Sequence, residues 1–400
     1  MKGLIDMSKW IPSWRYVPID YNQEVGVFEN ITQKAVFTNN LNGTKFRIRF
    51  NNLYRDEPMY IQHVGVALRN RNTGAASQQM MVTLNGSEQI CIPGNSEIYS
   101  DEIVTTISCF DDFLVSMYFK EKTVIRSVCT TSTANSWQCT QHTGNFYETD
   151  ALGFTIKPQL VPVLAMDPYP NQFVVGMDEI SVYNEDGAQL IGLFGDSITH
   201  MSYYSDPFIS MLYDRFPGKF SVINGGIAGN RINKPYPSMP NFPGQGHQFG
   251  IAGKERFLKD MYDGAQPDII FIMEGVNDCS HSLVFGEADV PTPADIFEAL
   301  KQVVTQAQAQ GSKVYVTTIT PFGAFGDAWR DQAEANRCGY NDLIRSNPIA
   351  DDWIDMDAIL RDPADPHRVQ GGMHLGDGVH PNWMGGKKIA KAIFDKWFAE

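Results

Sequence analysis

The stretch LIGLFGDS, at residues 190–197, decides the fold of the second half of the chain. Leu190 to Phe194 form a short apolar run that is typical of a buried strand. Gly195 follows, and Ser197 then stands where the next helix is expected to begin. Open parallel sheets place their functional sites beyond the carboxyl ends of such strands, so Ser197 is a candidate functional residue. Taken alone, Asp196 and Ser197 can equally be read as helix-capping residues.

Strands and helices alternate from this stretch to the end of the chain. Apolar runs predict further strands at 220–223, 268–273, 313–319 and 353–354. Helices are expected at 208–216, 296–309, 327–346 and 384–398. The run at 268–273 is apolar enough to be buried on both faces. This alternation predicts a parallel sheet with helices on both faces.

The first 185 residues follow a different pattern, in which apolar and polar residues alternate. The segment 45–50, KFRIRF, predicts a half-buried strand, and residues 113–119 repeat the pattern. Asn42-Gly43 and Asn85-Gly86 are hairpin signals, since both residue types tolerate positive φ. Many short strands with turns between them predict an antiparallel, jelly-roll-like β-sandwich. We place the boundary near Asp186-Gly187, which gives domains at 1–185 and 186–400.

Composition narrows the class of protein. The net charge of −14 argues against nucleic-acid and anionic-membrane partners, because both favour a basic face. The N-terminus has no apolar segment typical of a signal peptide, and no run is long enough to span a membrane, so we expect a cytoplasmic protein. The six cysteines form no CxxC pair, which disfavours a structural zinc site. Cys129 and Cys139 are close enough in sequence to pair, with free buried thiols as the alternative.

Two further motifs follow predicted strands. The segment 224–230 reads NGGIAGN, and its glycines would let backbone approach a ligand closely. A plain turn and a dinucleotide loop are the alternatives, although the spacing is not GxGxxG. In Gly275-Val276-Asn277-Asp278, the amide of Asn277 could donate to a developing oxyanion. Asn-Asp is also a common turn pair.

The last motif is DGVHP, at residues 377–381. A histidine that acts as a base needs a group to fix its tautomer, and Asp377 can reach Nδ1 of His380. Metal binding by His374, Asp377 and His380 is the competing interpretation. The intervening Gly and Pro residues favour a loop, to which helical ligand spacing does not apply.

The four motifs FGDSITH, NGGIAGN, EGVND and DGVHP together resemble the GDSL family, also called SGNH hydrolases, over about residues 188–400. Ile198 replaces the leucine that names the first motif. The N-terminal part is similar to the β-domain that precedes some esterases of the family, with Trp10, Trp14 and the strand of Arg47 and Arg49. The resemblance implies a flavodoxin-like hydrolase domain.

The resemblance also implies a role for each motif residue. Ser197 is the expected nucleophile, His380 its base, and Asp377 the carboxylate that orients the base. The backbone N–H groups of Ser197 and Gly229 and the side chain of Asn277 would form the oxyanion hole. No metal and no organic cofactor is implied.

Residues near these motifs are candidates for binding substrate. Arg231 could bind a polar substrate group or pair with an acidic neighbour. The full set of substrate-binding candidates is Asn230, Arg231, Phe325, Trp329 and Trp383. The segment 233–249 is rich in Pro, Gly and aromatic residues and predicts a long surface loop near the site.

We therefore expect a serine esterase that hydrolyses short acyl esters, above all O-acetyl groups on carbohydrates, through an acyl-enzyme. The expected partner is a small-molecule or oligosaccharide ester. The same triad would serve a lysophospholipase, lipase or thioesterase, or an acyltransferase that hands the acyl group to an alcohol. A non-catalytic binding module would not need all five motif residues together.

Overall fold

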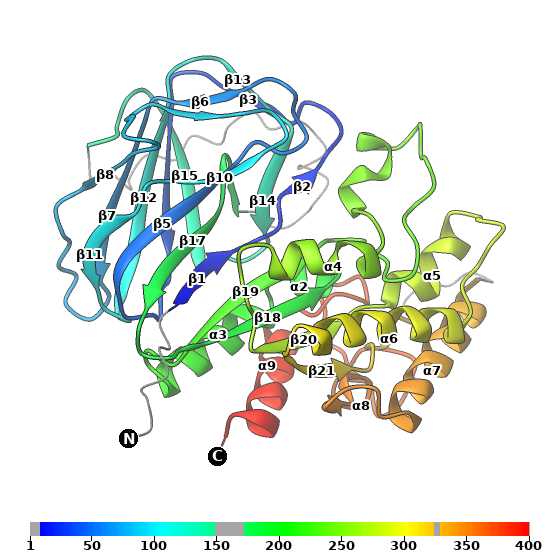
Figure 1. Cartoon of the computed structure of the whole chain (residues 1–400). Coiled ribbons are helices and arrows are strands. Elements are labelled where there is room, and N and C mark those ends of the chain that lie inside the picture. Colours follow the sequence, from blue (N-terminus) through cyan, green and yellow to red (C-terminus); the bar gives the residue numbers. More distant parts are fainter. Residues whose placement is uncertain (1–8, 149–171, 324–328, 400) are drawn as a thin grey trace. The chain divides into compact units, whose positions relative to one another are not determined.

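The computed structural model describes residues 9–148, 172–323 and 329–399 (Figure 1). The chain forms two compact units. The first, which we call the β-rich unit, consists of Met1–Leu190, Tyr213–Ile223 and Pro240–Gln245. The second, the α/β unit, consists of Ile191–Leu212, Asn224–Met239 and Gly246–Glu400.

The β-rich unit is built around two antiparallel sheets. One sheet contains, in order, β1 (Lys9–Arg15), β17 (Met177–Asn184), β5 (Gly43–Asn51) and β10 (Glu97–Tyr99), with β11 (Ile103–Ile107) also paired to β5. The other contains β15 (Trp137–Thr143), β4 (Ile31–Phe37), β12 (Asp111–Phe119), β7 (His63–Asn70) and β8 (Met80–Val82). Smaller sheets pair β2 (Ile19–Asp20), β14 (Ser127–Thr131) and β16 (Gln172–Val174), then β3 (Gly26–Phe28) with β13 (Thr123–Ile125), and β6 (Met59–Ile61) with β9 (Ile90–Ile92).

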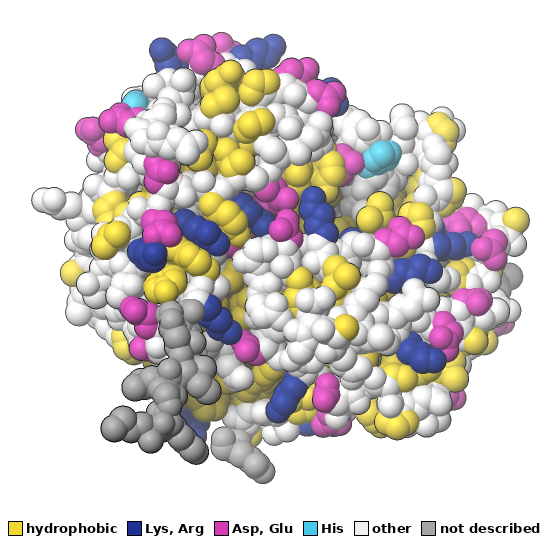
Figure 2. All heavy atoms as spheres, viewed as in Figure 1, with side chains coloured by type: hydrophobic (Ala, Val, Ile, Leu, Met, Phe, Trp, Pro, Cys, Tyr) yellow, Lys and Arg dark blue, Asp and Glu magenta, His cyan; other side chains and the backbone are white. Residues whose placement is uncertain are grey.

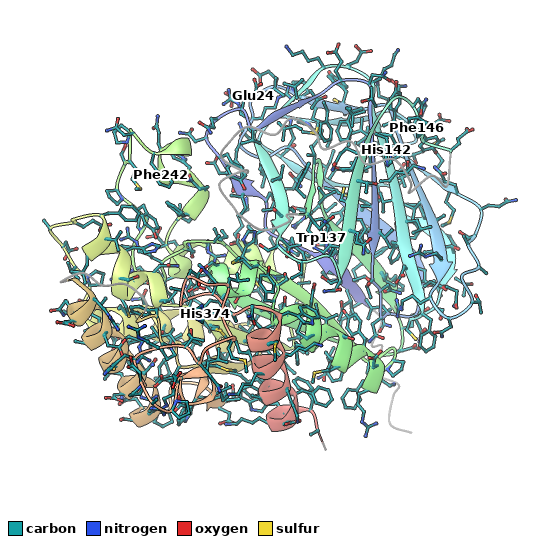
Figure 3. All side chains as sticks on the ribbon, turned by 180° about the vertical axis from the view of Figure 1, so that it is seen from behind. Glu24, Trp137, His142, Phe146, Phe242 and His374 are labelled. Atoms are coloured by element: carbon teal, nitrogen blue, oxygen red, sulfur yellow. The ribbon has the colours of Figure 1, made fainter. Side chains whose placement is uncertain are left out.

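Aromatic side chains from both large sheets meet in the core of this unit. Phe46 of β5 is fully buried, and its ring lies 5.3 Å from the ring of Phe113 on β12. Trp14 of β1 lies 4.3 Å from Phe37 of β4. Trp137, labelled in Figure 3, comes from β15 and is 1% exposed. Because each ring pair joins one large sheet to the other, the expected packing of two antiparallel sheets is confirmed.

One predicted turn is confirmed and the other is wrong. Asn85 and Gly86 adopt φ of 53° and 77°, and the strand-like bridge Leu84–Ser87 closes the turn. The prediction of a hairpin at Asn42-Gly43 fails because the strand before it, β4, lies in the other large sheet. Its successor β5 pairs instead with β17, whose residues lie more than a hundred positions later in the chain. Cys129 and Cys139 are free thiols, so of the two alternatives that the sequence left open, the structure shows the unpaired one.

The α/β unit contains the five-stranded sheet that the apolar runs predicted. Its order is β19 (Phe220–Gly226), β18 (Gln189–Gly195), β20 (Ile269–Met273), β21 (Lys313–Thr317) and β22 (Asp352–Ile354). The pairs β18–β20, β20–β21 and β21–β22 run parallel. Counted along the chain, this order is 2-1-3-4-5, which is the flavodoxin-like arrangement.

The helices are α2 (Ser197–His200), α3 (Ser205–Arg215), α4 (Gly253–Tyr262), α5 (Val276–Val284), α6 (Pro293–Ala309), α7 (Trp329–Ser346), α8 (Met356–Leu360) and α9 (Trp383–Trp397), with a 3₁₀ turn η1 at Pro243–Phe249.

These helices cover both faces of the sheet. Phe271 of β20 contacts Phe208 of α3 and Trp397 of α9. Phe194 of β18 contacts Phe257 of α4. The register pairs Phe271 with Leu193, so Phe194 points to the opposite face of the sheet from Phe271. The predicted covering of both faces is therefore confirmed.

On the face of the molecule that Figure 2 shows, basic and acidic side chains are interspersed. Within the described part of the chain, no helix combines the length and apolar character that a membrane span needs.

Candidate active site

The candidate site lies where three neighbouring strands of the α/β unit end. β18 ends at Gly195, β19 at Gly226 and β20 at Met273. Shortly after these ends come Ser197 at the start of α2, Gly229 in the loop after β19, and Asn277 in the first turn of α5. This is the edge of the sheet at which open α/β folds bind ligands.

The sequence left open whether Asp196 and Ser197 are helix-capping or functional residues, and in the structure only Asp196 caps the helix. The side chain of Asp196 caps α2, since it accepts the backbone N–H of Ile198 at 3.0 Å. Ser197 is the first residue of the helix, where backbone N–H groups have no partner within the helix. Its hydroxyl is thus not used as a cap. A side chain at Gly195 would collide with the carbonyl of Met273, so the strand can end this close to β20 only with glycine.

Ser197, His380 and Asp377 form a continuous hydrogen-bonded chain. Nε2 of His380 lies 2.8 Å from Oγ of Ser197, and its Nδ1 lies 2.6 Å from Oδ2 of Asp377. The carboxylate can only accept, so Nδ1 carries the proton and Nε2 is left to accept from the serine hydroxyl. This assignment of the tautomer follows from the geometry of the two contacts.

The environment keeps Asp377 ionised. Partial burial raises the pKa of its carboxyl group, but the hydrogen bond and charge of His380 and two backbone N–H donors lower it to about 2. Those donors are the N–H groups of Val379 and His380, at 2.9 and 3.0 Å from Oδ1. One oxygen therefore anchors the loop, and the other faces the imidazole.

His374 shapes the same loop. Its Nδ1 accepts the N–H groups of Gly376 at 3.1 Å and Gly378 at 3.0 Å, and Figure 3 places the residue in the segment before α9. Both glycines have positive φ, at 106° and 77°. Within residues 9–148, 172–323 and 329–399, no group of three His, Cys, Asp or Glu side chains is placed to hold a metal ion. The sequence signal at His374 thus belongs to a hydrogen-bonded loop.

The segments that carry Gly229 and Asn277 contact each other. Gly229 has φ of 77°, and a Cβ at this position would collide with the ring of Phe249. Asn277 donates one amide hydrogen to the carbonyl of Asn230 at 2.8 Å. Because the amide has two hydrogens, one N–H is left for a further acceptor.

Two buried residues that the sequence reasoning missed hold these segments in place. Arg256 of α4 donates to the carbonyls of Gly195 at 2.9 Å and Gly225 at 2.7 Å, and so ties the ends of β18 and β19 together. Asp278 accepts the N–H groups of Ile232 and Asn233, both at 2.9 Å. An arginine on an amphipathic helix carries no sequence signal for such a role, and Asn-Asp resembles an ordinary turn pair.

Asn230 and Arg231, predicted to bind substrate, are each 1% exposed. Asn230 donates to the carbonyls of Phe249 and Ile251 at 2.6 and 2.8 Å. Arg231 donates to Glu287 at 2.7 Å, so of its two predicted roles the structure shows the acidic pair. Both side chains are engaged by the protein itself, and this geometry argues against contact with substrate.

The remaining substrate-binding candidates are three aromatic residues. Trp383 is the first residue of α9, is partly exposed, and has the ammonium of Lys387 5.3 Å from its ring centre. Trp329 is the first residue of α7, and Phe325 lies outside the described residues. Substrate contact by these three residues stays a prediction.

Residues 193–388 match the GDSL-like lipase/acylhydrolase family. These residues therefore form a domain of this family, and the chain is an enzyme of the carboxylic ester hydrolase class. A search of curated protein sequences gave no significant match.

Solved structures similar to this chain include three hydrolases. A GDSL-like lipase from Bacteroides thetaiotaomicron is 17% identical, with 52% of this chain and 87% of that chain covered and a TM-score of 0.38. An acetyl xylan esterase is 20% identical, with 52% and 100% covered and a TM-score of 0.39. A catalytic mutant of an acetylxylan esterase from Geobacillus stearothermophilus is 16% identical, with 53% and 95% covered and a TM-score of 0.40.

Proposed function

We propose that this protein is a serine esterase that hydrolyses short-chain acyl esters, with O-acetyl as the preferred acyl group. The observation that carries the proposal is the hydrogen-bonded chain from Ser197 through His380 to Asp377. A serine alone is a poor nucleophile, and a neutral imidazole at hydrogen-bond distance activates it.

The reaction proceeds in two balanced steps. Oγ of Ser197 attacks the ester carbonyl while Nε2 of His380 takes the hydroxyl proton. The same proton then passes to the oxygen of the leaving alcohol, and an acyl-serine remains. In the second step water attacks that acyl group and gives a proton to His380. The imidazolium then returns this proton to Oγ of Ser197 as the bond between Oγ and the acyl carbon breaks, which releases the carboxylic acid and the free serine. Throughout, the ionised Asp377 stabilises the imidazolium that forms and holds its orientation.

Three donors are available for the negative oxygen of the tetrahedral intermediate. They are the backbone N–H of Ser197, the backbone N–H of Gly229 and the second amide N–H of Asn277. One such donor typically lowers the barrier by about 2.7–4 kcal/mol. The support for this assignment is the common location of the three residues at the carboxyl edge of the sheet.

Bulky rings beside Gly229 support a short acyl group. Phe249 packs directly on the Cα of Gly229, and the ring of Tyr236 lies 4.4 Å from that of Phe249. A long acyl chain would have to displace these rings wherever it ran past Gly229. The β-rich unit supports a carbohydrate as the alcohol, by analogy with sandwich domains that bind glycans.

The first test is hydrolysis of 4-nitrophenyl acetate, butyrate and octanoate by the wild type and by Ser197→Ala. We expect turnover that falls with chain length and is reduced by at least about 10³-fold in the variant, since the nucleophile is lost. Ser210→Ala, which changes an exposed serine of α3, is the matched control and should keep full activity.

Two results would count against the proposal. Unchanged turnover in Ser197→Ala would remove the nucleophile assignment. Preference for octanoate would overturn the short-acyl part and favour a lipase-like activity. Release of acetate from an acetylated oligosaccharide is then the test of the carbohydrate part, and an acyl product formed on an added acceptor sugar would favour a transferase.

A further inference from the structure

We infer that Tyr236 and His281 form a positioning pair that holds Gly229 in the orientation needed for its N–H to stabilise the oxyanion. The inference rests on the proposed function, because it assigns Gly229 a part in that reaction. Neither residue belongs to the four motifs, and neither is a partner of Ser197, His380 or Asp377 in the contacts described above.

The two side chains form a hydrogen-bonded relay that ends on the backbone of Gly229. The hydroxyl of Tyr236 donates to the carbonyl oxygen of Gly229 at 2.7 Å. The same hydroxyl is hydrogen-bonded to Nδ1 of His281. A phenol has a single proton, so when Tyr236 donates to Gly229 the proton between Tyr236 and His281 must sit on Nδ1. A donor bonded to the phenol oxygen polarises the O–H group and strengthens its own hydrogen bond.

The charge state of His281 agrees with this direction of donation. Burial, followed by the nearby positive charge of Arg231, lowers the pKa of His281 to about 4. The imidazole is therefore neutral at pH 7 and carries one proton. With that proton on Nδ1, His281 acts as a fixed donor to Tyr236.

Gly229 is restrained from three directions. Tyr236 holds its carbonyl, the ring of Phe249 packs against its Cα, and Asn277 holds the carbonyl of the next residue, Asn230. The φ of 77° at Gly229 is one that only glycine adopts at low cost, and glycine is also the residue with the most freedom to leave it. Fixing the carbonyls on its C-terminal side limits rotation about the Cα of Gly229, and so fixes the direction of its N–H.

The helix α5 carries two of the residues that hold the segment around Gly229. Asn277 and His281 are four residues apart, so they lie on the same side of the helix, one turn from each other. One helix thus presents both a proposed oxyanion donor, Asn277, and the support for another, Gly229. A displacement of the segment around Gly229 would misdirect one donor and leave substrate binding elsewhere unchanged.

The test is Tyr236→Phe, which keeps the ring packed on Phe249 and removes only the hydroxyl. Losing a whole oxyanion donor lowers kcat by about 10²–10³-fold, and a donor that is only loosened should lose part of this. We expect kcat on 4-nitrophenyl acetate to fall about 10- to 100-fold with KM within about twofold of the wild type. Tyr262→Phe is the matched control, because the Tyr262 hydroxyl bonds Ser312 beside the amino end of β21, at the opposite edge of the sheet.

Inhibition by phenylboronic acid distinguishes a positioning role of Tyr236 from an effect on the stability of the protein alone. The boronic acid adds to Oγ of Ser197 and presents a tetrahedral anion to the proposed oxyanion hole. Its affinity should fall in Tyr236→Phe by about the same factor as kcat, while the melting temperature stays near that of Tyr262→Phe. In the same way, His281→Gln keeps an N–H donor and should retain most activity, whereas His281→Phe should resemble Tyr236→Phe.

Two outcomes overturn the inference and are distinguishable. An active wild type with unchanged kcat and boronate affinity in Tyr236→Phe would show that Gly229 needs no such support, and the inference alone would fall. A wild type without Ser197-dependent turnover on any ester would overturn the proposed function, and the inference would fall with it.

Discussion

Three buried acidic residues follow the ends of β18 and β20 along the chain. Asp196 and Glu274 are each 1% exposed, and Asp278 is fully buried. Burial is the largest cause that raises the pKa of all three, to about 7, 8 and 6 respectively. Arg256, only 3% exposed, is among the charges that lower the pKa of Asp196 and of Glu274. At neutral pH these carboxyl groups are therefore not all ionised.

Glu274 makes stability depend on pH. Among the described residues, neither of its carboxyl oxygens has a hydrogen-bond partner, and Arg256 lies 3.9 Å away. The folded-state pKa of about 8 lies above the ordinary 4.5, so the folded state favours the protonated form. The stabilisation that comes from this raised pKa is fully present below pH 4.5, and it is lost as the pH rises through about 8.

Glu274→Gln should therefore flatten the dependence of stability on pH. The variant is neutral at every pH. At pH 8–9 its free energy of unfolding should therefore exceed that of the wild type by on the order of 1 kcal/mol. Urea denaturation at pH 5, 7 and 9 measures this, with the exposed Glu298→Gln as control. A variant that loses several kcal/mol at pH 8 would instead mean that Glu274 is charged and paired with Arg256.

At the scale of elements, α5 organises the site more than any single strand. Four of its side chains, from Asn277, Asp278, His281 and Ser282, bond to residues of the segment 230–236. Their spacing places them along one side of the helix. Through these bonds, α5 fixes the position of the segment 230–236, which has little regular structure of its own.

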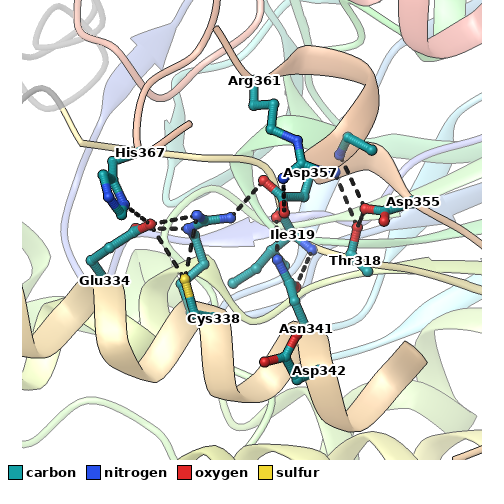
Figure 4. A network of polar contacts seen from close by, with 12 residues as sticks. Thr318, Ile319, Glu334, Cys338, Asn341, Asp342, Asp355, Asp357, Arg361 and His367 are labelled. Carbon is teal, nitrogen blue, oxygen red and sulfur yellow. Dashed lines mark hydrogen bonds and ion pairs between the residues drawn. The ribbon is translucent and has the colours of Figure 1, made fainter. Parts of the chain in front are cut away.

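A buried ionic network, shown in Figure 4, joins the helix α7 to its neighbours. Arg337 of α7, whose side chain is 2% exposed, donates to Glu334 at 2.7 Å and to Asp357 of α8 at 2.9 Å. The carboxylates of both partners are also largely buried. The network links α7 to α8 beyond the end of β21.

Arg337→Met should destabilise the protein by about 3 kcal/mol, because it leaves two buried carboxylates with one cation fewer. Arg345 still binds Asp357 at 2.7 Å, which holds the expected loss at the lower end of the range for such pairs. Chemical denaturation measures the change. Arg345→Met, which changes a side chain that is 26% exposed, serves as control and should cost less. A loss below about 0.5 kcal/mol for Arg337→Met would contradict the role of this network.

At the scale of the whole molecule, the two units are not consecutive stretches of chain. Residues Tyr213–Ile223 comprise the end of α3, its connection to β19 and the first part of β19, yet they belong to the β-rich unit. There the side chain of Asn40 donates to the carbonyls of Phe216 at 3.2 Å and Phe220 at 2.9 Å. Ser221 donates to the carbonyl of Pro12 at 2.6 Å.

A fragment of residues 186–400 should therefore be less stable than the same residues in the whole chain. It loses the partners of these three hydrogen bonds, at about 1 kcal/mol each. For a unit of this size, that corresponds to a melting temperature roughly 6–12 °C lower. Calorimetry on the fragment and on full-length Asn40→Ala, which removes two of the bonds, checks this. An unchanged melting temperature in the fragment would mean that the boundary predicted near residue 185 separates independent domains.

Local patterns determined much of the α/β unit. The strands at 190–194, 220–223, 268–273 and 313–319 were predicted within a few residues, as were the helices that became α6, α7 and α9. They were predictable because strand burial and helix periodicity are written in consecutive residues. The four motifs also gave Ser197, Gly229, Asn277, Asp377 and His380 as candidates, because each motif is a short run of consecutive residues.

Tertiary structure alone decided which residues hold those motifs together. Arg256, Asp278, His374 and the pair of Tyr236 and His281 act through partners that lie far away in the sequence or on backbone groups, and no local pattern records such partners. The same reason explains the failed hairpin at Asn42-Gly43, where a distant strand, β17, supplied the pairing. The sequence by itself determined many of the elements and the candidate reactive residues, because both depend on neighbours along the chain. The orientation of those residues depends on buried hydrogen bonds between distant segments, and only folding brings these together.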